Sequence, residues 1–294
     1  MLRRFAYTLL TALAAGAAAA CGGAEDTAPP VATPSVTLAG PEAAIGSPME
    51  MAYRFAVAPD APAFAEDYWV FVHFKDTDGE LMWTDDHPPP TPTRSWTAGE
   101  TIDYPRTMFV PRFPYVGETR VEIGLFSPAT GERLPLAGET EGQRAYIVGT
   151  FDLRLQTDNL FVVFRDGWHQ TEVAGDSGIE WQWSEQEAIL AFPNPRRDVT
   201  VYLQVDQPAT GAFAEPQRVE VRLGPAVVDA FDLPPGPFDL RRISITADQL
   251  GTADTVEMAL SVDKTFVPAL IPALRSADPR ELGVRVFRVY VQPS

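Results

Sequence analysis

The sequence predicts an all-β protein built from two tandem antiparallel β-sandwich domains. Apolar and polar residues alternate with a period of two in many short segments, which is the pattern of half-buried strands. The clearest segment spans 199–206, and its apolar positions are Val199, Val201, Leu203 and Val205. Glycine, proline and aspartate separate such segments, and only 247–250 and 268–273 favour short helical turns. Many short strands joined by such turns are typical of sandwiches.

The chain of 294 residues divides into four expected parts. These are a signal peptide at 1–20, a flexible tether at 21–34, a first sandwich at 35–155 and a second at 156–294. The strands expected in the first sandwich are 49–57, 70–74, 121–125 and 144–152, with hairpin turns at 76–79 and 127–131. Those expected in the second are 160–165, 179–183, 188–192, 199–205, 218–223, 227–233, 243–246, 256–262 and 284–291.

The first residues have the layout of a secretory signal. Arg3 and Arg4 precede an apolar stretch at 5–15, and small residues lead to Cys21, the single cysteine of the chain. This ending resembles the lipobox of bacterial lipoproteins, which implies diacylglycerol on the Cys21 thiol and an acyl chain such as palmitate on its freed amine. It also implies a location in the cell envelope, outside the cytoplasm, and Gly22 in place of aspartate favours the outer over the inner membrane of a Gram-negative cell. The alternative is an ordinary secretory cut that leaves a free thiol, which would invite intermolecular pairing in an oxidising compartment.

The charge of the chain limits its partners. It carries 40 acidic and 23 basic side chains, a net charge of −17, and removal of residues 1–20 takes away two arginines and no acid, which leaves −19. Such a surface repels phosphate backbones and anionic lipid headgroups, so we expect no nucleic-acid partner. The membrane partner is therefore expected to be reached through acyl chains at Cys21, and two or more chains hold stably.

Several motifs between residues 71 and 136 resemble a recurring extracytoplasmic domain of bacterial membrane proteins. The matching segments are Phe71-Val72-His73, Asp78-Gly79, Asp85-Asp86, Pro88-Pro89, Trp96 to Glu100 and Gly124 to Leu134. That domain is a β-sandwich appended to multi-spanning, glycosyltransferase-like envelope proteins, and the resemblance implies an Ig-like first sandwich with no catalytic role.

The second half is similar to a galactose-binding-like jelly roll, a domain often appended to envelope glycan enzymes. The matching segments are Gly167-Trp168, Trp181 to Ser184, Phe266 to Pro268 and Asp278 to Val284. Many domains of this fold bind sugars and many only pack against neighbouring domains, so the fold alone does not decide the function.

Aromatic and polar residues in this half form the candidate ligand site, since aromatic rings stack on the apolar faces of sugars. The candidates are Trp168, His169, Gln170, Glu172, Trp181 and Trp183. Trp168 follows Asp166-Gly167 in an expected loop, which favours its exposure. Trp181 and Trp183 share a strand face with Ile179, which favours core packing as the alternative.

Other motifs suggest chemistry that their surroundings do not support. The segment 175–178 copies the Gly-Asp-Ser-Gly motif of trypsin-like proteases, but a serine nucleophile needs a positioned histidine, and the segment suits a hairpin turn. Acids at 76–80 and 85–87, with His73, could gather around a divalent ion, but the distal glutamate of a calcium loop is missing. We therefore predict no catalytic residue, no metal and no cofactor.

Three functions remain open. The first is a non-enzymatic envelope lipoprotein that binds or scaffolds, with an envelope glycan or a glycan-handling membrane protein as partner. The second is a structural subunit that binds another protein through sheet edges or loops and has no sugar affinity. The third is a glycoside hydrolase, which would need two carboxyl groups facing each other across a cleft.

Overall fold

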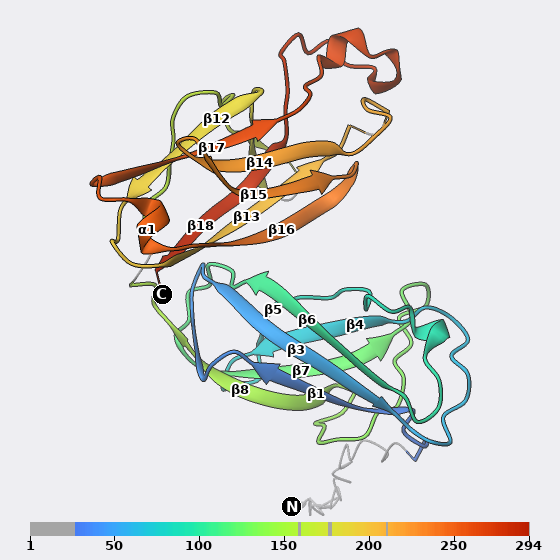
Figure 1. Ribbon diagram of the computed structural model, residues 1–294. Helices are drawn as coiled ribbons and strands as arrows, with labels where there is room; N and C mark the ends of the chain where they lie inside the picture. Colours follow the sequence, from blue (N-terminus) through green and yellow to red (C-terminus); the bar gives the residue numbers. More distant parts are fainter. Residues whose placement is uncertain (1–26, 158–159, 176–177, 210, 294) are drawn as a thin grey trace, which may run out of the picture.

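The computed structural model describes residues 27–157, 160–175, 178–209 and 211–293. Figure 1 shows two β-sandwiches, with the first half of the chain below and the second half above, so the predicted all-β fold is confirmed. Cys21 and the expected signal peptide lie outside the described residues, and the lipid anchor stays a prediction. Within the described ranges, no helix is long and apolar enough to cross a membrane.

The first sandwich pairs a three-stranded sheet with a five-stranded one. The smaller sheet has the order β1–β3–β6, formed by Ala32–Leu38, Pro48–Val57 and Thr101–Phe109. The larger has the order β2–β8–β7–β4–β5, formed by Glu42–Ala44, Tyr146–Arg154, Gly117–Phe126, Trp69–Lys75 and Leu81–Thr84. A 3-10 turn, η1, covers Thr93–Ser95. β2 pairs in parallel with β8, while β1, β3 and β6 pair antiparallel.

The core of the first sandwich lies between these sheets and follows the predicted alternation. On β3 the buried positions are Met49, Met51, Tyr53, Phe55 and Val57. The facing sheet contributes alternate apolar residues from β4 and β7, such as Val72 and Ile123. Because buried apolar area is the dominant stabilising term, this core can hold the sandwich without a disulfide.

Two edge strands of the smaller sheet contain proline. β6 was not predicted from the sequence, since Pro105 and Arg106 interrupt its alternation. A strand proline is tolerated at a sheet edge, where its missing N–H faces outward, and Pro34 occupies the other edge in β1. β1 begins at Ala32, within the segment expected to be tether, because Ala32 is buried and pairs with Val57.

The second sandwich has two five-stranded sheets. The first has the order β10–β11–β18–β13–β16, formed by Glu172–Val173, Glu180–Trp183, Arg285–Pro293, Val199–Gln207 and Gly236–Ile245. The other has the order β15–β14–β17–β12–β9, formed by Ala226–Leu233, Gln217–Leu223, Thr255–Val262, Glu187–Pro193 and Val163–Phe164. Their core includes the four apolar residues of 199–205. The bounds predicted for the two domains stay a prediction, while each sandwich has its own core.

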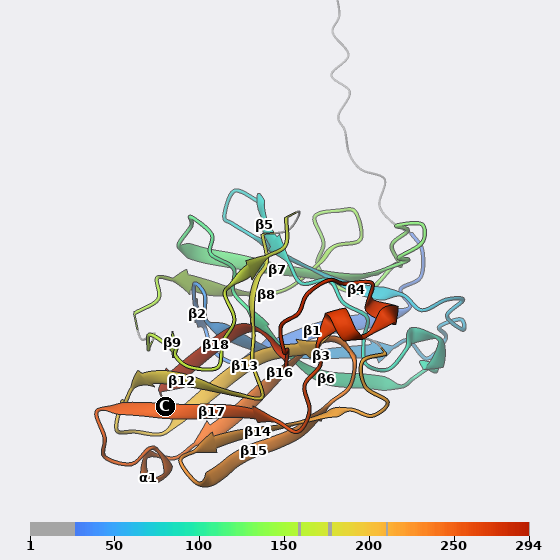
Figure 2. The ribbon, with the colours of Figure 1, turned by 90° about the horizontal axis from the view of Figure 1, so that it is seen from above.

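Short helical turns lie where the sequence places them. α1 (Ala247–Leu250) is capped by the preceding residue, Thr246. The Thr246 hydroxyl accepts from the Gln249 backbone N–H, while the Gln249 side chain accepts from the Thr246 N–H. The turns η2 (Pro268–Leu270) and η3 (Pro272–Leu274) lie on the loop between β17 and β18, visible as a compact coil in Figure 2.

The two sandwiches meet around the ring of Phe109 at the end of β6. Its centroid lies 6.3 Å from those of Tyr202 and Tyr290, and the Arg288 guanidinium lies 4.4 Å from the ring centre. Figure 1 shows β13, β16 and β18 on the side of the upper sandwich that faces the lower one. The sheet of the second sandwich therefore presents one face to the first.

Candidate functional site

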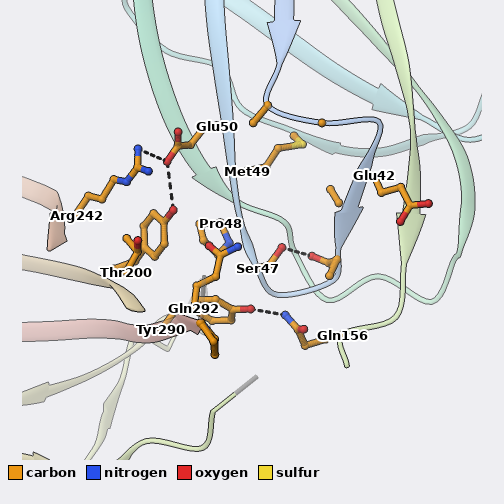
Figure 3. Close-up of a pocket in the computed structure, with 16 residues that line it drawn as sticks. Glu42, Ser47, Pro48, Met49, Glu50, Gln156, Thr200, Arg242, Tyr290 and Gln292 are labelled. Carbon is orange, nitrogen blue, oxygen red and sulfur yellow. Dashed lines mark hydrogen bonds and ion pairs between the residues drawn. The ribbon is translucent and has the colours of Figure 1, made fainter. Parts of the chain in front are cut away.

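A cleft of about 480 Å³ lies between the two sandwiches. Figure 3 shows its lining, which comes from the β2–β3 region of the first sandwich and from the facing sheet of the second. The polar side chains that line it are Glu42, Ser47, Glu50, Gln156, Thr200, Tyr202, Arg242, Tyr290 and Gln292. Ligand clefts typically measure about 300–1,000 Å³, so the cleft has the size of a small-molecule or sugar site.

Strand alternation builds the wall contributed by the second sandwich. On β13, Val201 points into the core, so Thr200 and Tyr202 point out of it toward the cleft. Tyr202 lies opposite Arg242 of β16 and Tyr290 of β18. Thr200 lies opposite Gln292 of β18 in the adjacent row, so three strands place five polar side chains on one face.

A tight connection between β2 and β3 builds the other wall. Gly46 has φ +80°, which glycine adopts without strain, and its N–H donates to Val110 O at 2.9 Å. The Ser47 hydroxyl donates to Ala44 O at 2.7 Å. These bonds fix the turn and direct the start of β3, including Glu50, toward the second sandwich.

Polar contacts cross the cleft between the two walls. Glu50 accepts from the Tyr202 hydroxyl at 3.2 Å and forms an ion pair with Arg242 at 2.7 Å. The Gln156 amide donates to the Tyr290 hydroxyl at 2.6 Å. Burial, aided by the negative charge of Glu50, raises the pKa of Tyr202 to about 12, so its hydroxyl stays protonated as a donor. The contacts hold the walls at a defined separation.

The tryptophans predicted as ligand residues are largely packed. Trp168 is half-buried, with its ring 4.7 Å from that of Phe164 and its N–H bonded to Ile189 O at 2.9 Å. Trp183 is 7% exposed and packs edge to face on Phe266. The packing of Trp183 matches the core-packing alternative, whereas Trp168, which was expected to be exposed, packs against the core of the second sandwich.

Trp181 lies differently from the other two tryptophans. It is half-buried on β11, with its ring 6.3 Å from Phe287 and the Arg285 guanidinium 5.1 Å from its centre. Its indole N–H is buried and has no hydrogen-bond partner among the described residues. Arg285 is itself held by Asp206 through bonds of 2.8 and 2.6 Å, so the ring borders a fixed ion pair.

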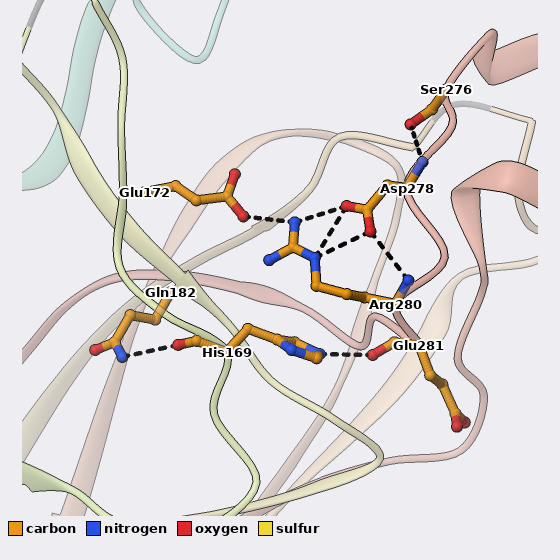
Figure 4. A network of polar contacts seen from close by, with 7 residues as sticks. All are labelled: His169, Glu172, Gln182, Ser276, Asp278, Arg280 and Glu281. Atoms are coloured by element: carbon orange, nitrogen blue, oxygen red, sulfur yellow. Dashed lines mark hydrogen bonds and ion pairs between the residues drawn. The ribbon is translucent and has the colours of Figure 1, made fainter.

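The polar candidates His169 and Glu172 belong to a network around Arg280, shown in Figure 4. Arg280 bonds to Glu172 at 2.7 Å and to both carboxylate oxygens of Asp278, the closer at 2.6 Å. His169 Nε2 lies 2.8 Å from Glu281 O. The network ties the β9–β10 segment to the loop before β18, which is a structural role, while the last candidate, Gln170, is exposed.

The motifs of the first half also have structural partners. Phe71 lies opposite Gly124, and the Arg133 guanidinium covers its ring at 4.1 Å. Asp85 forms two bonds to Arg106 at 2.6 and 2.7 Å. The Asp76 carboxylate accepts from two backbone N–H groups of its own turn, at 3.0 and 2.9 Å, as a turn residue rather than an ion ligand does.

Buried His87 has both ring nitrogens engaged. Nδ1 lies 2.8 Å from Asp85 O and Nε2 lies 2.8 Å from the Tyr104 hydroxyl. Desolvation by burial lowers the pKa of His87. The described residues contain no group of three or more His, Cys, Asp or Glu side chains that could hold a metal ion.

The cleft residues were not among the candidates drawn from the sequence. One feature of the sequence did point to the cleft. In the alternating segment 199–206, Tyr202 is an aromatic residue at a position that faces away from the core. The protease-like segment joins β10 to β11, which pair antiparallel as the predicted hairpin requires, while Asp176 and Ser177 themselves lie outside the described residues.

No protein-family model matches the chain. No curated protein matches its sequence. Among solved structures, the N-terminal CBM22-1–CBM22-2 tandem domain of Paenibacillus barcinonensis Xyn10C is 10% identical, with 88% of this chain and 94% of that chain covered and a TM-score of 0.27. The M60 catalytic domain with CBM51-1 and CBM51-2 of Clostridium perfringens ZmpB is 8% identical, with 84% and 34% covered and a TM-score of 0.27.

A third similar structure is the Pseudomonas fluorescens alkylpurine DNA glycosylase AlkC bound to DNA containing an abasic site analog. It is 13% identical, with 42% of this chain and 31% of that chain covered and a TM-score of 0.25. The matched part thus spans about a third of the AlkC and ZmpB chains. These TM-scores are low, and the fold described above rests on the strands and cores of this chain alone.

Proposed function

We propose that this protein is a lipid-anchored protein of the bacterial cell envelope that binds glycans without altering them chemically. The observation that carries the glycan-binding part is the cleft between the sandwiches, whose walls place amide, hydroxyl and charged groups around one space, while the anchor rests on the lipobox-like ending at Cys21. Sugar hydroxyls both donate and accept hydrogen bonds, and Gln292 and Thr200 can supply either kind of partner. The net charge of −17 disfavours nucleic acid as the alternative ligand.

Binding without hydrolysis is favoured by the arrangement of the carboxylates. Glu42 and Glu50 line the cleft from the same wall, and each is paired with an arginine, Arg154 at 2.9 Å and Arg242 at 2.7 Å. Glycoside hydrolysis needs two carboxyl groups that flank the scissile bond, one of them available as an acid. The ion-paired glutamates do not form such a pair.

Glycan-array binding of the purified chain tests the sugar affinity and locates it. Gln292→Ala removes an exposed amide in the cleft, and Gln170→Ala removes an exposed amide at the other candidate site. We expect Gln292→Ala to weaken binding by about 0.5–1.5 kcal/mol, the net value of one hydrogen bond, and Gln170→Ala to leave it unchanged. The opposite pattern would move the site to the β9–β11 region, and a blank array with the wild-type chain would refute glycan binding.

Metabolic labelling with a clickable fatty acid tests the anchor. The wild-type chain should take up the label and fractionate with the outer membrane, whereas Cys21→Ser should lose both properties. A labelled Cys21→Ser protein would contradict lipidation at this residue. Because Cys21 is far from the cleft residues in sequence, the variant should keep the glycan affinity of the wild type.

A structural subunit that binds another envelope protein is a second candidate, favoured by one apolar loop. All nine residues from Phe266 to Leu274 are apolar, and Leu270 is 77% exposed. A photo-crosslinker at position 270 should then capture one defined envelope protein in cells, and Leu270→Asp should abolish that association. A chain that binds no glycan but gives this crosslink would favour the second candidate.

A further inference from the structure

We propose that the cleft selects uncharged glycans, and that the carboxylate of Glu50, which occupies Arg242, is the group that rejects glycans carrying a carboxylate. This inference rests on the proposed glycan-binding function and names the ligand class of the same site. It is carried by the position of the pair, the balance of charges on the walls and the contacts of Glu50.

The ion pair lies across the cleft and is accessible to a ligand. Arg242 Nη1 lies 2.7 Å from Glu50 Oε1, and the two side chains are 56% and 35% exposed. Figure 3 shows both residues at the same end of the lining, one from each sandwich. A ligand in the cleft therefore meets the arginine together with its carboxylate partner.

The charges of the cleft wall are unbalanced toward the negative. Among the described residues, its charged lining consists of Glu42, Glu50 and Arg242, and the guanidinium is already paired with Glu50. Arg154, outside the lining, pairs with Glu42 at 2.9 Å but also with Asp152 at 3.2 Å, so three carboxylates meet two guanidinium groups. An anionic sugar would have to displace Glu50 from Arg242 while facing Glu42, and like charges brought together in a cleft are costly. Rejection through an unfavourable charge is an established route to specificity.

Glu50 is fixed by a second contact, which makes its displacement harder. The same oxygen, Oε1, accepts from the Tyr202 hydroxyl at 3.2 Å, and Tyr202 is only 4% exposed. A neutral sugar needs no such displacement, because hydroxyl groups can bond to the pair and to Gln292 as they stand.

Glu50→Gln tests the role of the charge with little change of shape. Glutamine keeps a carbonyl oxygen for the Tyr202 hydroxyl, while Arg242 loses its anionic partner and can take a ligand carboxylate in its fork of N–H donors. Asp103→Asn is the matched control. It frees Arg54, which bonds to Asp103 at 2.6 Å on the neighbouring part of β3 and β6, outside the lining of the cleft.

The probes are neutral hexose and N-acetylhexosamine oligosaccharides, each printed beside the same backbone with one C6 hydroxymethyl group oxidised to a carboxylate. The full chain and both variants are compared at one salt concentration, with melting temperatures measured in parallel. We expect the wild type to bind a neutral probe at least about tenfold more tightly than its oxidised form. Glu50→Gln should bring the two affinities together, and Asp103→Asn should behave as the wild type.

Arg242→Gln provides a second variant that does not depend on the folding of Glu50→Gln. It removes the only cation among the described lining residues and leaves both glutamates, so the preference for neutral probes should persist. Equal wild-type binding of neutral and oxidised probes, an unchanged preference in a folded Glu50→Gln, or loss of the preference in Arg242→Gln would each overturn the inference while glycan binding stands. Absence of binding to every probe would instead refute the proposed function and this inference with it.

Discussion

Gly124→Ala should destabilise the first sandwich measurably, because no space is left for a methyl group beside Phe71. A Cβ on residue 124 would overlap the Phe71 ring and lie 2.8 Å from Arg144 O. Phe71 is 2% exposed and covered by the Arg133 guanidinium at 4.1 Å, so its ring cannot swing outward without losing that contact. Overpacking of this kind costs about 1–3 kcal/mol.

Differential scanning calorimetry of the full chain measures the effect. With about 2–4 °C per kcal/mol for a protein unit of this size, the melting temperature should fall by about 2–12 °C. Gly149→Ala is the control, since Gly149 lies on the neighbouring strand β8 and a methyl group there would have no described atom within 4 Å beyond its chain neighbours. A Gly124→Ala chain that melts with the Gly149→Ala chain would refute the close packing described for Phe71.

Three further predictions concern stability and the contact between the sandwiches. Burial lowers the pKa of His87 in the folded chain, so the unfolded chain binds more protons once the pH is below about 6.5, the ordinary pKa of histidine. The free energy of unfolding therefore falls as the pH drops through that value. Urea titrations at pH 7.5 and 5.5 should show a smaller fall in the free energy of unfolding for His87→Gln than for the wild type. Phe109→Ala should increase hydrogen exchange in β13 and β18, because it removes the ring that contacts both strands, whereas Phe161→Ala, at a 74% exposed position, should not. In urea titrations, Trp183→Ala should lower the free energy of unfolding by about 3–5 kcal/mol, whereas Leu270→Ala, at an exposed position, should change it little. Equal effects of the two variants would contradict the burial of Trp183.

The strands with clear alternation could be predicted from the sequence, because one side of each strand is buried in a core and the other side is not. The segment 199–205 falls within β13, and 218–223 within β14, since every second residue there points into the core. β6 escaped prediction because an edge strand tolerates Pro105, which a strand pattern counts as a break. Alternation thus misses an edge strand where proline breaks the pattern, whereas the edge strand β15, which contains no proline, was predicted.

The cleft could not be predicted from the sequence for a different reason. Glu50 and Arg242 belong to separate sandwiches, and their contact depends on how the two units pack around Phe109. No local pattern encodes that packing. For Trp183 the sequence left core and ligand face open, and the decision came from the packing of Phe266 against its ring.

The prolines in β1 and β6 have a consequence for association with other chains. Both strands are edges of the three-stranded sheet, and Pro34 and Pro105 each interrupt the row of N–H groups that an added strand would need. Continuation of this sheet by β-augmentation, whether by a partner or in an amyloid-like stack of copies, is therefore blocked in the middle of both edges. Under the proposed lipid anchoring, copies would meet at high local concentration on a membrane surface, where such protection would limit their association.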